Sequence, residues 1–171
     1  MRKLMFLLIA MLGTLIAAGQ SAEGRYASRM TTDGTIYFVV PKKIKHLSNL
    51  KKFEYDMTLL SWKDSVTVNF TFESPLMEVP EKLEIKSGNN YFKCNDYHPL
   101  FIDIKKNHYE VRITSKFPLE EIRKMIESSV SPVFIFEQCG QPRSASYSPG
   151  AWRKDRKKLF DVMQIYLYSR K

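Results

Sequence analysis

The sequence predicts a single α+β domain: a mostly antiparallel sheet of about seven or eight strands, built around three hairpins, with two helices in the C-terminal half. Two observations lead to this prediction. In the middle of the chain, apolar and polar residues alternate, which is typical of half-buried antiparallel strands. Towards the end, apolar residues recur at helical spacing on either side of one further strand. We assign the domain to residues 35–171.

The first residues have the pattern of a secretory signal peptide, which we assign to residues 1–19. Arg2 and Lys3 precede an apolar run over residues 4–18, and small residues follow this run. The run is shorter than the about 20 residues of a membrane-spanning helix, so we expect a cleaved signal rather than an uncleaved anchor.

Cleavage is expected near Gly19 and Gln20, with a cut after Ala22 as the alternative. Gln20 stands where a bacterial lipoprotein would carry its lipidated cysteine. We therefore expect an exported protein, periplasmic or secreted, that is not a lipoprotein and does not span a membrane.

After the signal, the sequence is first polar, then apolar and then basic. Residues 20–34 are polar and small, and we interpret them as a flexible leader outside the core. The apolar run over residues 35–40 predicts a strand that is buried on both faces, and Pro41 ends it. A basic connection follows.

Three hairpins account for the middle of the chain. In the first, residues 53–59 and 66–72 alternate between apolar and polar side chains on either side of a short turn. The second spans residues 83–94 and turns at a Gly-Asn pair, which readily adopts positive φ. The third spans residues 99–116 and turns at an Asn-His pair.

Two segments have helical spacing. After Pro118, apolar residues recur three and four positions apart, and two glutamates stand in the first turn, where the helix dipole favours them. One more strand is expected over residues 132–138. The last helix is expected from about Pro149 towards Lys171, with Ser148 as its N-cap.

The two cysteines, Cys94 and Cys139, are expected to form a disulfide. An exported chain meets an oxidising environment, and both cysteines lie at the ends of apolar runs. Two free thiols are the alternative, because a sequence does not reveal whether the geometry permits a bond. A zinc site made of Cys94, His98 and Cys139 would lack a fourth ligand, so no metal and no cofactor are expected.

A basic cluster at the start of the last helix is the candidate binding site. The apolar stripe of this helix lies opposite most of its basic residues, which a solvated helix face would also explain. However, the charges crowd the N-terminal half, where the helix dipole disfavours cations and unpaired N–H groups attract anions. Asp155 alone offsets them. The residues proposed to bind an anion or an acidic partner are Arg143, Ser146, Ser148, Arg153, Lys154, Lys157 and Lys158.

The sequence contains no recognisable catalytic set. Its three histidines are far apart, and it has neither a Gly-rich phosphate loop nor a serine-elbow motif. A formal net charge of +9 favours anionic partners, but no nucleic-acid-binding module accompanies it. We therefore expect a non-enzymatic binding domain for an unidentified protein or an anionic component of the cell envelope. A small envelope hydrolase and a structural subunit of an envelope assembly are the alternatives.

Overall fold

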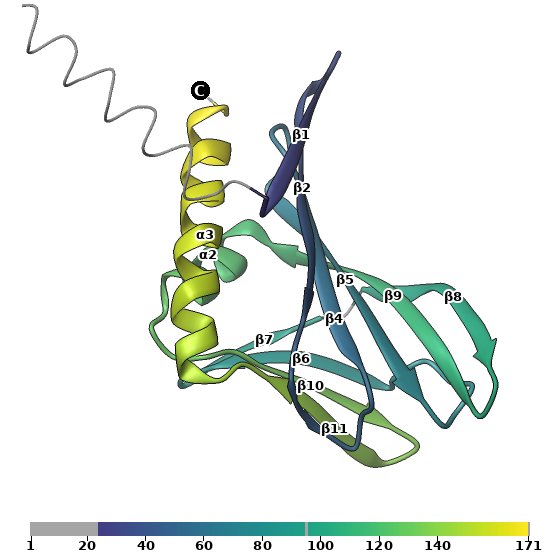
Figure 1. Cartoon of the computed structure of the whole chain (residues 1–171). Helices are drawn as coiled ribbons and strands as arrows, with labels where there is room; N and C mark the ends of the chain where they lie inside the picture. Colours follow the sequence, from purple (N-terminus) through teal and green to yellow (C-terminus); the bar gives the residue numbers. More distant parts are fainter. Residues whose placement is uncertain (1–23, 95, 171) are drawn as a thin grey trace, which may run out of the picture.

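The computed structural model describes residues 24–94 and 96–170, which form a single sheet-rich α+β domain with two antiparallel sheets and two helices (Figure 1). The first sheet has the strand order β1-β2-β4-β5-β9-β8, and the second has the order β3-β11-β10-β6-β7. The first sheet consists of β1 (Tyr26–Thr31), β2 (Gly34–Lys43), β4 (Phe53–Leu60), β5 (Ser65–Ser74), β9 (His108–Pro118) and β8 (Tyr97–Lys105). The second consists of β3 (His46–Ser48), β11 (Gln141–Ser146), β10 (Val133–Gln138), β6 (Lys82–Ser87) and β7 (Asn90–Lys93). The helices are α2 (Leu119–Glu127) and α3 (Pro149–Tyr168).

The three predicted hairpins are confirmed, because β4 pairs with β5, β6 with β7 and β8 with β9. The prediction of one sheet with about seven or eight strands is too simple. The described residues form 11 strands in two sheets. The chain leaves the first sheet after β5, through a segment that contains Pro75 and Pro80, and enters the second sheet at β6. Proline has no N–H to continue a ladder, so this segment ends the pairing of β5.

The two sheets face each other across an aromatic core. Phe53 of β4 packs against Phe134 of β10, with ring centroids 5.1 Å apart. Phe72 of β5 stacks on Phe136 of β10 at 5.2 Å. These side chains are at most 1% exposed, and such aromatic pairs stabilise a core beyond the area they bury.

Helix α3 covers the part of the first sheet that the second sheet leaves open (Figure 1). Tyr37 of β2, opposite the second half of β4, meets Tyr166 of α3 edge to face at 5.9 Å. Helix α2 packs against α3, and Trp152 Nε1 donates to the Ser128 carbonyl at 3.2 Å. The predicted apolar stripe of α2 is confirmed, and its buried residues are Leu119, Ile122, Met125 and Ile126.

Residues 26–31 form β1, where the sequence predicted a flexible leader over residues 20–34. β1 is an edge strand that pairs only with β2, and nearly all of its side chains are exposed. Such a strand is held by its backbone and needs no apolar alternation, so its sequence resembles a leader. The predicted signal at residues 1–19, and residues 20–23, lie outside the described residues.

The apolar run over residues 35–40 predicted a strand buried on both faces, but only one face of β2 is buried. Tyr37 and Val39 are buried against the core, but Phe38 and Val40 are 44% and 41% exposed on the other face. No described segment forms a layer over these two residues on the outer face of the first sheet, so an apolar sequence does not by itself imply two covering layers.

The predicted disulfide is absent, because Cys94 and Cys139 are both free thiols. Cys94 follows β7 and Cys139 follows β10, and β6 lies between these two strands. Two strand spacings amount to about 9.6 Å, more than the about 7 Å between Cα atoms that a disulfide can bridge. The Cys94 thiol is buried and lies 3.3 Å from the Asp96 carbonyl, whereas the exposed Cys139 thiol lies 2.5 Å from Glu78 Oε2.

Gly34 at the β1–β2 turn is expected to be intolerant of a side chain. Its φ of +137° favours glycine, and a Cβ there would lie 2.4 Å from Ser61 Oγ and 3.0 Å from the Trp62 ring. We expect Gly34→Ala to lower the free energy of unfolding by about 1–3 kcal/mol, measured by urea denaturation. Gly150→Ala is the control, because that position has neither positive φ nor a neighbour within 4 Å. Equal stability of the two variants would contradict the prediction.

Candidate functional site

The first turn of α3 forms as the sequence predicts. Ser148 is the N-cap, its side chain accepts from the Ala151 N–H at 3.4 Å, and Pro149 is the first helical residue. The Trp152 N–H bonds the Ser148 carbonyl. Within the described residues, the Gly150 N–H is therefore the one donor of this turn without an acceptor. The helix end contributes less to anion binding than an uncapped terminus would.

Asp155 points into the protein and pairs with Arg25, which precedes β1. Arg25 Nε donates to Asp155 Oδ1 at 3.0 Å and Nη2 donates to Oδ2 at 3.3 Å, and a third nitrogen of Arg25 donates to the Val40 carbonyl. Asp155 is 3% exposed and Arg25 5% exposed. The two charges are thus desolvated together, as a bidentate pair.

Two tyrosines complete this buried network. Tyr147 donates to Asp155 Oδ2 at 2.5 Å, and the Tyr55 hydroxyl lies 2.8 Å from that of Tyr147. Burial, together with the proximity of Tyr55 and Asp155, raises the pKa of Tyr147 above its ordinary value. The hydroxyl therefore stays protonated, as a donor to the carboxylate must be.

Asp155 points inward and so does not lie on the exposed face of this part of α3, and the next acid along the helix is Asp161, four residues after Lys157. We call Arg153, Lys154, Lys157 and Lys158 the α3 basic surface. All four side chains are exposed, and none forms a salt bridge within the described residues. From the sequence, we expected Asp155 to offset these charges. In the structure, its carboxylate pairs with Arg25 instead.

Hollows border the α3 basic surface on both sides. One, of about 380 Å³, lies between α3 and the β2 region and is lined by Lys42, Lys154 and Lys158 among others. The other, of about 350 Å³, lies at the start of the helix and is lined by Gly150 and Arg153 among others. Cationic side chains thus contribute to the lining of both recesses, Asp155 also lines the first, and Lys42 adds to the predicted set.

The structure separates two of the predicted residues from the α3 basic surface. Arg143 lies near the start of β11, the end farther from α3, and its side chain is buried between the sheets. Ser146 alternates with Arg143 and lies half-buried on the opposite face of β11. The predicted cluster is therefore two regions: a helix surface, and a cavity around Arg143.

Sequence reasoning missed Arg25 and Lys42 as neighbours of α3. Arg25 and Asp155 are 130 positions apart, and no local pattern connects them. Lys42 lies in a basic stretch that the sequence indicated only as a connection, and its Nζ lies 3.8 Å from Asp155 Oδ1. The one available signal was Asp155 itself, an acidic residue near the apolar stripe of a helix.

The α3 basic surface offers a ligand positive charge and N–H donors. In the part of the chain that the structure describes, no group of three or more His, Cys, Asp or Glu side chains is placed to hold a metal ion. Neither α2 nor α3 combines the length and apolar composition that crossing a membrane requires. Comparison of the chain with protein-family models, with curated proteins and with solved structures gives no significant match.

Proposed function

We propose that this chain is an exported, non-enzymatic binding domain that recognises an anionic partner through the α3 basic surface. The observation that supports the proposal is the set of four exposed cations on one helix face, without an acidic partner among the described residues. Clustered charge of one sign attracts a partner of the opposite sign and speeds its association. The partner is an acidic protein surface or an anionic component of the envelope.

The position of these charges has an energetic cost that a partner would offset. The helix dipole acts mainly within the first turn, so Arg153 and Lys154, which follow that turn, oppose it only weakly. Arg153 and Lys157, and likewise Lys154 and Lys158, are like charges four residues apart, which also repel on a helix. Negative charge brought by a partner would relieve both effects, whereas a solvated face has no need for this arrangement.

The test is capture from an envelope extract of the source cell with a charge-reversed variant. The baits are the tagged protein and a variant in which Arg153, Lys154, Lys157 and Lys158 are all replaced by Glu. We expect the parent chain to hold a partner that the variant loses by about tenfold or more, and that added salt releases. Mass spectrometry, with lipid and glycan analysis, identifies what is bound.

A matched control carries the same charge change elsewhere. Lys45, Lys63, Lys93 and Lys116 are exposed and lie off α3, so their replacement by Glu should leave capture intact. The α3 variant should fold as the parent does, because all four positions are exposed and the glutamate pairs replace basic pairs that repel to a similar extent. Equal capture by the parent chain and the folded α3 variant would refute the proposed function.

A further inference from the structure

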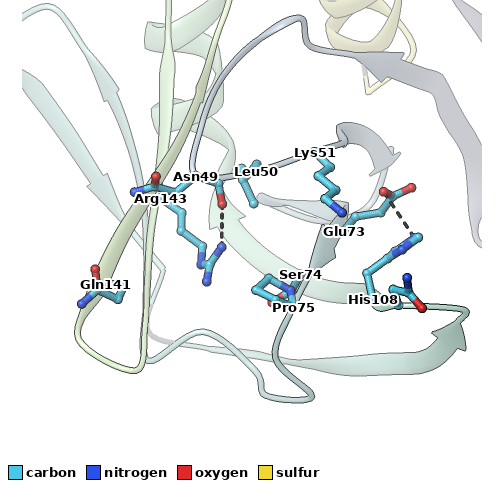
Figure 2. Close-up of a pocket in the computed structure, with 10 residues that line it drawn as sticks. Asn49, Leu50, Lys51, Glu73, Ser74, Pro75, His108, Gln141 and Arg143 are labelled. Atoms are coloured by element: carbon cyan, nitrogen blue, oxygen red, sulfur yellow. Dashed lines mark hydrogen bonds and ion pairs between the residues drawn. The ribbon is translucent and has the colours of Figure 1, made fainter.

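A cavity of about 480 Å³ opens between the two sheets, at the end of β11 that is farther from α3 (Figure 2). Its walls come from the β3–β4 connection, the end of β5, the β8–β9 turn and the start of β11. Both sheets therefore contribute to it. Its volume falls within the range of small-molecule sites, about 300–1,000 Å³.

Arg143 is the buried charge of this cavity. Its side chain lies on the inner face of β11, and the residue is 7% exposed. Nη1 donates to the Asn49 carbonyl at 2.5 Å, the contact drawn in Figure 2. Nε is buried, and within the described residues it has no hydrogen-bond partner. A guanidinium thus lines the cavity with at least one donor unused.

No acid compensates this charge within the described residues. Glu73 also lines the cavity, but its carboxylate lies beside His108, with Oε2 3.3 Å from His108 Nε2. Figure 2 shows this pair across the cavity from Arg143. Lys51 adds a second cationic side chain to the lining, and none of the salt bridges of the described residues includes it.

A buried charge without a counter-charge and with an unused donor is costly, and native proteins rarely keep one without a function. Arg143 does not hold the sheets together by an ion pair, since within the described residues its one hydrogen bond goes to a carbonyl. A ligand that brings a negative charge and acceptor oxygens would supply what is missing. A guanidinium, with its planar fork of donors, matches a carboxylate or a phosphate.

We propose that this cavity is a binding site for a small ligand with a carboxylate or phosphate group, which the Arg143 guanidinium receives. Lys51 adds long-range attraction at the same opening. The site is independent of the α3 basic surface, because it lies at the other end of β11 and uses different residues. A protein that fails to capture a partner through α3 can still bind a ligand here.

The test follows the Nε–H resonance of Arg143 in a nitrogen–proton correlation spectrum. The probes are inorganic phosphate, acetate and succinate, each titrated into the labelled full chain, so that the phosphate and carboxylate arms are distinguished. We expect at least one probe to shift this resonance in a saturable way. If no probe shifts it, the proposal is wrong. The titration uses the unmutated chain, and a variant is needed only to assign the resonance.

A variant pair identifies the residue responsible. Arg143→Met keeps the length of the side chain and removes the charge, and we expect it to weaken binding of the active probe about 10- to 100-fold. It should not lower the thermal midpoint appreciably, because it removes an uncompensated buried charge. Arg29→Met, on exposed β1, is the matched control for net charge. Unchanged affinity in Arg143→Met would overturn the proposal.

Discussion

Replacing Asp155 by alanine is expected to lower the free energy of unfolding by about 3–5 kcal/mol. The change leaves Arg25 buried with its positive charge uncompensated, and it removes the carboxylate that accepts from the Tyr147 hydroxyl. It also releases the only ion pair that ties the segment before β1 to α3 in the described residues. Urea denaturation, followed by circular dichroism, measures the loss. A decrease below about 1 kcal/mol would show that the network is dispensable.

A variant that lacks both charges distinguishes the stability that the ion pair contributes from the cost of leaving one charge buried without its partner. In Arg25→Met with Asp155→Leu, no charge is left buried without its partner, so we expect most of the lost stability to return. Arg25→Met alone should lower the free energy of unfolding nearly as much as Asp155→Ala, since it leaves the Asp155 carboxylate buried without its partner. If the double variant is no more stable than the single ones, the network contributes through its geometry and hydrogen bonds rather than through charge compensation.

Phe136→Ala is expected to destabilise the protein by about 3–5 kcal/mol, the range for truncating a buried aromatic ring. The Phe136 ring stacks on Phe72 at 5.2 Å and lies 5.5 Å from Phe53, so it joins β10 to both central strands of the first sheet. Its removal leaves a cavity between two rigid sheets, which cannot close easily. The measurement is chemical denaturation.

Phe38→Ala provides the matched control for this core variant. Phe38 lies on the outer face of β2 and is 44% exposed, so its ring buries much less area and leaves no cavity. We expect a loss of less than about 1.5 kcal/mol. Similar losses for Phe38→Ala and Phe136→Ala would mean that the outer face is covered in solution, for example by a second copy of the chain.

The parts of the fold that the sequence predicted are those with a local signal. Alternation along β4 and β5 predicted a hairpin, because each strand has one buried and one polar face. The spacing in α2 predicted its buried residues for the same kind of reason. Strand β1 was missed because it is an exposed edge strand without apolar alternation. Strand β11 lies between β3 and β10 and was missed because its buried residues, Arg143 and Ala145, are not large apolar side chains. Their pairing is decided by their neighbours, not by their own residues.

Among the candidate site residues, too, those with a local sequence signal were predicted and the others were not. The four exposed cations of α3 were predicted correctly as one helix face, because helical spacing fixes which residues lie together. The position of Arg143 was not predictable, since it depends on β11 being a strand and on the register that turns residue 143 inward. The disulfide prediction was wrong for the same reason: the order of strands in the sheet separates the two cysteines.

The pairing of Arg25 with Asp155 has a consequence for how the protein is made. Arg25 leaves the ribosome 130 residues before its partner, and until α3 follows, the inner face of β2 remains open to water. Native packing of the N-terminal strands therefore waits for the last helix, and the growing polypeptide stays loosely structured in the meantime. Such a delay would suit the export that we propose, because a chain crosses a translocation channel before it folds. The same carboxylate that anchors the helix is thus also required for the final packing of the segment before β1.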